Sequence, residues 1–197
     1  MRPLPFIWPY ALVFWMVYFW AFGSEMVIVF RGQRSAAKRD SVDAGSLQVV
    51  TIGMSLALML AFALAFVPAL RFPQTAALPA FWTGLTLLIA GALLRRHCWR
   101  VLGEFFTGDV QARAEQPVID RGAYRWVRHP SYSAGIVMMI GIGVALGSWL
   151  SVVVSTTLTV VSYSYRIVVE ERALTAALGE KYVEFSRTRK RLIPFVV

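Results

Sequence analysis

The chain has 197 residues, of which 57% are hydrophobic and only 16% are charged. Soluble domains carry about 25% charged residues, so this composition predicts an integral membrane protein. The single cysteine, Cys98, excludes an intramolecular disulfide, and the two histidines, His97 and His129, form no Cys/His cluster with zinc-ligand spacing. The formal net charge of +9 has to be interpreted after the apolar segments are located, because basic loop residues also set membrane orientation.

Five apolar segments are each long enough to cross a hydrocarbon layer of about 30 Å as a helix. They cover residues 6–30, 47–67, 76–94, 132–150 and 151–169. The first segment is too long for a signal peptide and is expected to be a retained anchor. Only a short break at Gly147-Ser148-Trp149 interrupts the last two, which are therefore expected to form an antiparallel hairpin. The sequence predicts an all-α, polytopic membrane fold with about five transmembrane helices.

The lysines and arginines predict the orientation of this fold. Arg2 and Arg71 fall on one side of the five spans, and all other basic residues follow the first, third or fifth span. The amino terminus is therefore expected outside and the carboxyl terminus in the cytosol. We interpret the basic surplus as a topology signal and as contact with anionic lipid headgroups rather than nucleic-acid binding, since no spaced aromatic platform accompanies it. We divide the chain into a three-helix region, 1–94, and a candidate catalytic region, 95–197.

Charged residues end the fifth apolar segment. Arg166 and Glu170 are four residues apart and share one helix face, and Glu171 follows directly. Charges at the inner edge of a spanning helix need a partner or a polar cavity. Two interpretations are open: Arg166 and Glu170 form a surface ion pair, or they belong to a site with Glu171.

Pro130 predicts where the fourth span begins. Proline disfavours helix at the preceding His129 and suits the first helical position itself. The free backbone N–H groups of such a helix start can hold an anion. Arg128, His129 and Tyr132 would cluster there, either as part of a site or as interfacial anchors.

Three glycines inside the fourth span, Gly141, Gly143 and Gly147, do not have the spacing or the strand-to-helix context of a nucleotide fingerprint. Within an apolar helix they indicate close packing against a neighbouring helix.

Taken together, these segments resemble the isoprenylcysteine carboxyl methyltransferase family, which is broadly related to phospholipid methyltransferases. The resemblance covers about residues 99–197. It rests on Gly122-Ala-Tyr124, Arg128-His-Pro-Ser-Tyr132, Arg166, Glu170-Glu171 and Leu178-Gly-Glu-Lys-Tyr182. It implies an integral membrane enzyme that transfers a methyl group from S-adenosylmethionine, leaving S-adenosylhomocysteine, in a cytosol-facing pocket built by the last two spans and the carboxyl-terminal segment.

By position, the resemblance implies that Arg166 lies at the reacting carboxylate of a prenylcysteine-like or other lipidic acceptor. It implies cofactor contacts for Gln111, Gln116, Pro117, Val118, Ile119, Tyr124, His129, Pro130, Ser131, Tyr132 and Glu170. An acceptor carboxylate is ionised at neutral pH, so an arginine that orients it suffices, and displacement at a sulfonium needs no metal. The acceptor's lipid tail is expected to enter laterally between the spans.

Three other functions are open. A phospholipid N-methyltransferase would need Glu170, Glu171 or His129 to accept a proton from the amine. An NADPH-dependent sterol-type reductase would need a basic pocket for the 2′-phosphate, and no such cluster is evident. In a non-catalytic membrane protein the charged residues would only anchor the topology.

Overall fold

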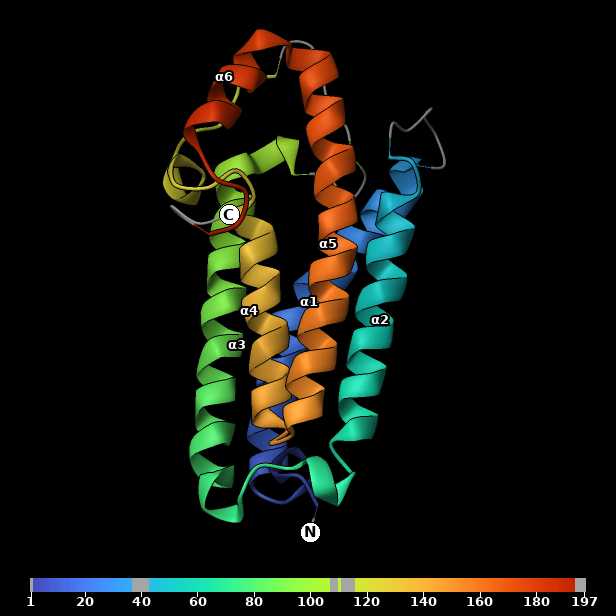
Figure 1. Ribbon diagram of the computed structural model, residues 1–197, viewed down its shortest axis with the longest axis vertical. Coiled ribbons are helices and arrows are strands. Elements are labelled where there is room, and N and C mark those ends of the chain that lie inside the picture. Colours follow the sequence, from blue (N-terminus) through green and yellow to red (C-terminus); the bar gives the residue numbers. More distant parts are fainter. Residues whose placement is uncertain (1, 37–42, 107–109, 111–115, 194–197) are drawn as a thin grey trace.

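The computed structural model describes residues 2–36, 43–106, 110 and 116–193. Within these ranges the fold is all-helical and contains no β-strand (Figure 1). Its helices are α1 (Tyr10–Ala36), α2 (Ser46–Leu64), α3 (Gln74–Leu102), α4 (Pro130–Ala145), α5 (Trp149–Leu178) and α6 (Glu180–Thr188). The first five follow the five predicted apolar segments in order, and α6 adds a short helix beyond them. The predicted all-α class is confirmed for the described residues.

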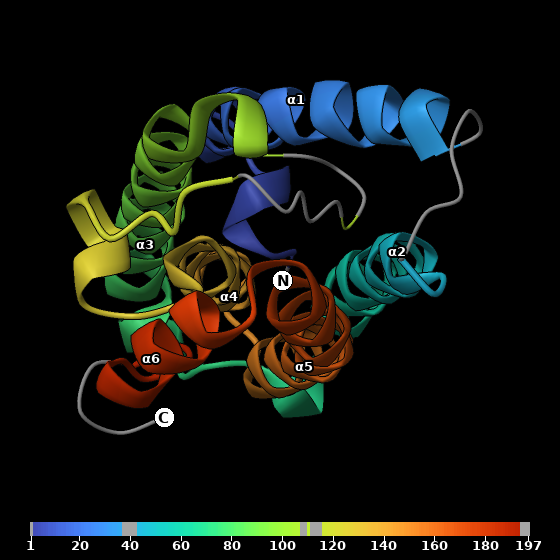
Figure 2. The same cartoon turned by 90° about the horizontal axis from the view of Figure 1, so that it is seen from above.

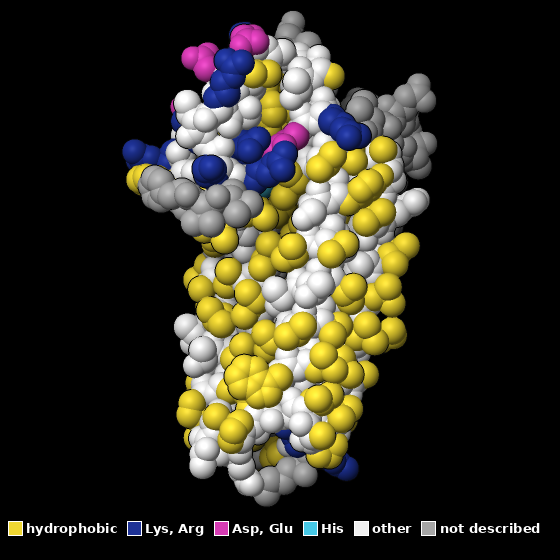
Figure 3. Space-filling model, viewed as in Figure 1, with side chains coloured by type: hydrophobic (Ala, Val, Ile, Leu, Met, Phe, Trp, Pro, Cys, Tyr) yellow, Lys and Arg dark blue, Asp and Glu magenta, His cyan; other side chains and the backbone are white. Residues whose placement is uncertain are grey.

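Three of these helices, α2, α3 and α5, are long and apolar enough to cross a membrane. Tyr10–Gly23 within α1 and the whole of α4 are shorter apolar helices. With 16 residues, α4 is shorter than the predicted 132–150 segment, because the chain already turns after Ala145. Hydrophobic side chains cover the long middle of the molecule, whereas most visible lysines and arginines gather at one end (Figure 3).

The hairpin predicted between the last two spans is confirmed. The turn between α4 and α5 contains Gly147 with φ of +68°, a left-handed conformation that glycine adopts without steric cost. Ser148 then caps α5, because its Oγ accepts a hydrogen bond from the Ser151 N–H at 3.3 Å. The predicted start of the fourth span at Pro130 is also confirmed.

Close packing of α3 against α4 depends on glycines. A Cβ on Gly84 of α3 would lie 2.3 Å from the Ala145 backbone nitrogen, and one on Gly141 of α4 would lie 2.7 Å from the Gly84 carbonyl oxygen. Gly143 lies equally close to α5, because a Cβ on Gly143 would lie 2.6 Å from Val152 Cα. The predicted packing role is therefore confirmed for Gly141 and Gly143, whereas a Cβ on Gly147 would meet nothing and that residue serves the turn.

Two helices complete the walls of the bundle. The α2 helix lies along α5, where Ser151 Oγ donates to the Ala61 carbonyl oxygen at 2.7 Å. The α1 helix runs obliquely across one side, which Figure 2 shows by its extended ribbon beside helices seen nearly end-on. Its Phe14 and Trp15 pack against Phe62 of α2.

Candidate functional site

One large cavity, about 650 Å³ in volume, lies near the basic end of the bundle. That size is typical of pockets for small molecules and cofactors. Its apolar part is lined by side chains of α1, α2 and α4, among them Tyr18, Phe19, Phe22, Leu47, Val50, Met54, Leu58 and Met138. Its polar part is lined from α3, the 116–132 segment, α5 and α6, among them Arg95, Tyr124, His129, Ser131, Tyr132, Arg166, Glu170 and Tyr182. A single cavity therefore joins a polar compartment to an apolar one.

Arg166 and Glu170 meet in this cavity through Tyr132. The Tyr132 hydroxyl donates to Glu170 Oε2 at 2.6 Å and accepts a hydrogen bond from Arg166 Nε at 3.3 Å. Arg166 is buried, with 7% of its surface exposed, and its Nη1 pairs with Asp43 Oδ1 at 2.8 Å. Of the two interpretations of the span-five charges, the structure places Arg166 in a cavity rather than in a surface ion pair.

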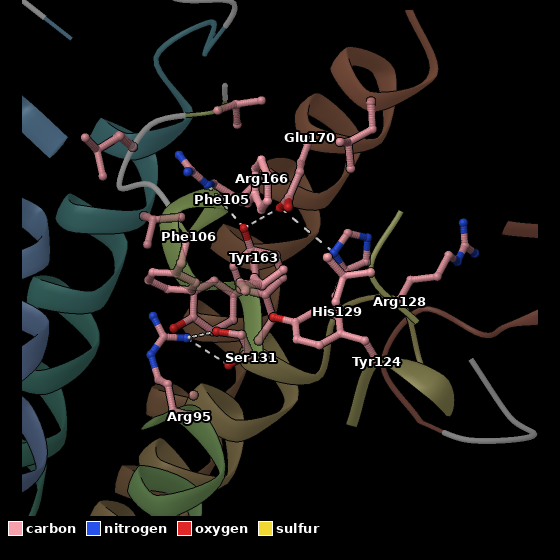
Figure 4. Close-up of a pocket in the computed structure, with 18 of the residues that line it drawn as sticks. Arg95, Phe105, Phe106, Tyr124, Arg128, His129, Ser131, Tyr163, Arg166 and Glu170 are labelled. Atoms are coloured by element: carbon pink, nitrogen blue, oxygen red, sulfur yellow. Dashed lines mark hydrogen bonds and ion pairs between the residues drawn. The ribbon is translucent and has the colours of Figure 1, made fainter. Parts of the chain in front are cut away.

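The two adjacent glutamates have different surroundings. Glu171 Oε1 lies 2.7 Å from Arg128 Nη1 and 3.2 Å from His129 Nε2, and Glu171 Oε2 accepts from Arg191 Nη2 at 2.8 Å. Glu170 instead lines the cavity, and Figure 4 shows it facing His129, whose Nδ1 lies 3.9 Å from Glu170 Oε2. Glu171 therefore ties structural elements together, while Glu170 is the carboxylate available to a ligand.

The start of α4 is held by the chain that follows α6. The N–H groups of Arg128 and His129 donate to the carbonyl oxygens of Lys190 and Arg191 at 2.8 and 2.9 Å. Ser133 Oγ donates to the Leu192 carbonyl oxygen at 2.6 Å. The Glu170 and Glu171 carboxylates contact side chains of the same region, the Tyr132 hydroxyl and His129 Nε2.

Most predicted site residues come together around this cavity. It is lined by Gln116, Pro117, Val118, Ile119, Tyr124, His129, Ser131, Tyr132, Arg166 and Glu170. Pro130 is buried as the first residue of α4 and is not among the lining residues. Gln111 lies outside the described residues. The roles given to these residues as cofactor ligands stay predictions.

Sequence reasoning missed two contributors to the site. The first is Asp43, buried before α2 and paired with Arg166. An acidic residue just before an apolar span could have been found by asking which carboxylate partners the Arg166 charge. The second is Arg95 of α3, whose Nη1 donates to Ser131 at the carbonyl oxygen and at Oγ, 2.8 and 3.0 Å away (Figure 4). The third apolar segment was predicted to end at residue 94, but α3 continues to Leu102 and carries Arg95 into the cavity wall.

The helical bundle, its apolar surface and a cavity lined partly by polar residues define an integral membrane protein with a cavity at the basic end of its helices. Comparison with known proteins gives the family. Residues 83–176 match the model of the isoprenylcysteine carboxyl methyltransferase family. A rice protein (Oryza sativa subsp. indica) named probable protein-S-isoprenylcysteine O-methyltransferase is 31% identical over 182 residues, which cover 88% of this chain and 90% of that protein. The chain belongs to the isoprenylcysteine carboxyl methyltransferase family.

Two other relatives are longer than the region they share with this chain. Protein-S-isoprenylcysteine O-methyltransferase B of Arabidopsis thaliana is 31% identical over 115 residues, 57% of this chain and 58% of that protein. The solved structure of a eukaryotic intramembrane Ras methyltransferase of this family superposes with a TM-score of 0.60 at 26% identity. The match covers 72% of this chain and 52% of that chain. The family resemblance inferred from the motifs is confirmed.

Proposed function

We propose that this protein is an S-adenosylmethionine-dependent carboxyl O-methyltransferase that acts on the carboxylate of a prenylated cysteine or a similar lipidic acid. One observation carries the proposal: Arg166 and Glu170, bridged by the Tyr132 hydroxyl, face one cavity that continues into an apolar compartment between α1 and α2. The names of its relatives support the same reaction class.

The residues present fit the proposed cofactor. The Tyr182 hydroxyl is buried at the cavity wall and finds no acceptor for its proton among the described residues, so a ligand with polar oxygens or nitrogens would satisfy it. The Glu170 carboxylate suits a cationic group or hydroxyl groups. Aromatic and aliphatic side chains nearby suit a flat heterocycle, and they are Phe105, Phe106, Leu174, Leu178 and Phe185. When bound, S-adenosylmethionine supplies an electrophilic methyl group on a sulfonium.

The chain's own residues would then bind and align the acceptor. A carboxylate needs no general base, so Arg166 serves by orienting it, and the surrounding apolar walls exclude water. The transfer would form a bond between an acceptor oxygen and the methyl carbon and would break the bond between that carbon and the sulfonium sulfur, which would leave S-adenosylhomocysteine with a neutral thioether. The apolar compartment lined by Phe22, Val50 and Met54 would hold the prenyl tail.

For the membrane topology we propose five membrane-embedded helices, with the amino terminus outside and the cavity facing the cytosol. The end that carries α6 and most of the visible basic side chains is then cytosolic (Figure 3). Arg2 and Arg71 lie at the opposite end in this arrangement. Regions 1–94 and 95–197 would act together, because the cavity takes lining residues from both.

Titration calorimetry of the detergent-purified protein with S-adenosylhomocysteine tests the proposal. We expect saturable binding, and at least tenfold weaker binding by Glu170→Ala, because a hydrogen bond to a charged group contributes about 1.5–3 kcal/mol. Glu180→Ala, which removes an exposed glutamate 3.7 Å from Arg187, is the matched control and should bind as the wild type does.

NADPH is the comparison ligand in the same titration. Saturable NADPH binding together with no S-adenosylhomocysteine binding would overturn the proposal in favour of a reductase. Binding of neither ligand by the folded protein would favour a non-catalytic membrane protein.

The width of the passage between the two compartments is expected to depend on Gly135. A Cβ at this position would lie 2.4 Å from the Tyr163 hydroxyl oxygen, and the Tyr163 ring packs against Tyr132 with centroids 4.8 Å apart. Gly135→Val should therefore reduce kcat/KM for a prenylated acceptor at least tenfold and leave S-adenosylhomocysteine affinity within threefold. Ala63→Val, at an exposed position of α2 that does not line the cavity, is the control and should keep wild-type kcat/KM. Full activity of Gly135→Val would contradict the tail path.

A further inference from the structure

Asp43 stands at the edge of the proposed site and has four hydrogen-bond donors. Its Oδ1 accepts from Ser46 Oγ at 2.8 Å, from the Val110 N–H at 2.9 Å and from Arg166 Nη1 at 2.8 Å. Its Oδ2 accepts from the Leu47 N–H at 2.9 Å. The side chain is 7% exposed. A carboxylate bound from so many sides is fixed in place and does not have to move to keep its charge satisfied.

The turn that contains Asp43 is hydrogen-bonded to α5. Ala44 and Gly45 both have positive φ, +45° and +72°, which reverses the chain immediately before α2. The Tyr165 hydroxyl donates to the Ala44 carbonyl oxygen at 3.0 Å, next to the Arg166 contact with Asp43. Two successive residues of α5 therefore hold this turn.

Asp43 also keeps its negative charge. Burial raises the pKa of its carboxyl, but the hydrogen bonds from Leu47, Val110 and Ser46 and the charge of Arg166 outweigh burial, so the pKa lies below its ordinary value. The group is thus a fixed anion at neutral pH.

Among the described residues, the carboxylates of Asp43 and Glu170 are both placed to attract the Arg166 guanidinium. Glu170 lies one helical turn from Arg166 on the same face of α5, a spacing at which an arginine and a glutamate attract each other directly. The contacts instead place Nη1 on Asp43 and on Ser46 Oγ, and Nε reaches Glu170 through the Tyr132 hydroxyl. The guanidinium is held toward α2.

We propose that Asp43 is a positioning residue that holds Arg166 toward α2 and so keeps Glu170 available to the cofactor. The inference rests on the proposed function, because it assigns Glu170 to the cofactor. Without the Asp43 charge, Arg166 turns to Glu170, which lies one helical turn away on α5, and both residues leave their ligands. Asp43 thereby acts on cofactor binding without touching the cofactor.

The test is a cycle of four proteins titrated with S-adenosylhomocysteine: wild type, Asp43→Asn, Arg166→Gln, and the double variant. Asp43→Asn should weaken binding at least fivefold. The double variant should bind within twofold of Arg166→Gln, because no arginine remains to occupy Glu170. If Asp43 acts only by positioning Arg166, the Asp43→Asn substitution no longer weakens binding once Arg166 is absent. If Asp43 had a merely structural role, the losses of affinity caused by the two substitutions would add in the double variant.

Two further measurements keep the test decisive. Asp120→Ala, which removes an exposed carboxylate 3.9 Å from Arg189, is the matched control and should bind as the wild type does. Melting temperatures report folding, and Asp43→Ala repeats the cycle if Asp43→Asn melts early. The inference about Asp43 would be overturned, and the proposed function would stand, if a folded Asp43 variant bound S-adenosylhomocysteine with wild-type affinity. The same holds if the double variant bound it more weakly than Arg166→Gln by the factor that Asp43→Asn loses. Failure of the wild type to bind would overturn the proposed function and the inference with it.

Discussion

Replacing Arg166 with glutamine is expected to lower methyl transfer to a prenylcysteine acceptor by about 10²–10³-fold, the usual cost of removing a group that stabilises charge at a reacting centre. Arg166 is the buried cation next to the Tyr132 hydroxyl, and its loss removes the group that would orient the acceptor carboxylate. Cofactor binding should change little, because Glu170 keeps its hydrogen bond from Tyr132. Transfer of a radiolabelled methyl group from S-adenosylmethionine, measured beside S-adenosylhomocysteine titrations, checks both expectations.

Two comparisons sharpen the Arg166 experiment. Arg166→Lys keeps the charge but loses the planar fork that donates from Nη1 and Nε, so it should recover only part of the activity. Base lability of the labelled product identifies the acceptor group, since a methyl ester hydrolyses in alkali and an N-methyl group does not. A base-stable product formed at an unchanged rate by Arg166→Gln would replace the carboxylate acceptor with an amine.

The second large effect is expected on folding. Gly141→Val should lower the melting temperature of the detergent-solubilised protein by about 10 °C or abolish folding, because overpacking in a close-packed interface costs about 1–3 kcal/mol or more. The added Cβ would lie 2.7 Å from the Gly84 carbonyl oxygen and from the Leu88 nitrogen. Both are backbone atoms, so no change of side-chain rotamer relieves the contact and α3 and α4 must separate.

Gly23→Val provides the matched measurement, since a Cβ at that helical glycine meets no atom within 4 Å. Its melting temperature should stay within about 2 °C of the wild type. An equal loss in both variants would mean that the cost comes from replacing a helical glycine in general and not from the contact between α3 and α4.

The parts of the fold that follow from local pattern could be predicted from the sequence. The lengths of the apolar segments predicted the helices, Pro130 predicted the start of α4, and the short break at 147–149 predicted the hairpin of α4 and α5. The structure also brings together ten of the twelve predicted site residues at one cavity. The helices, the start of α4 and the hairpin could be predicted because each depends on a short stretch of chain with a strong conformational or hydrophobic preference.

The remainder depends on contacts between distant segments, which no local pattern encodes. Asp43 and Arg166 are 123 positions apart, and their pairing appears only when α2 lies along α5. The contact of Arg95 with Ser131 depends in the same way on α3, which continues past the predicted apolar segment 76–94 to Leu102 and lies beside α4. The acceptor's tail was expected between spans, but the contribution of α1 and α2 to the apolar lining depends on how these helices pack, including the oblique course of α1 (Figure 2).

The contacts between the start of α4 and the segment after α6 have a consequence for biosynthesis. Arg128 and His129 donate their backbone N–H groups to Lys190 and Arg191, residues that leave the ribosome about sixty positions later. Until then the α4 and α5 hairpin can enter the membrane, but these two N–H groups must bond to water. A chain that ends before residue 190 lacks these carbonyl acceptors, so the start of α4, which carries Tyr132 into the cavity, is not held as it is in the complete chain.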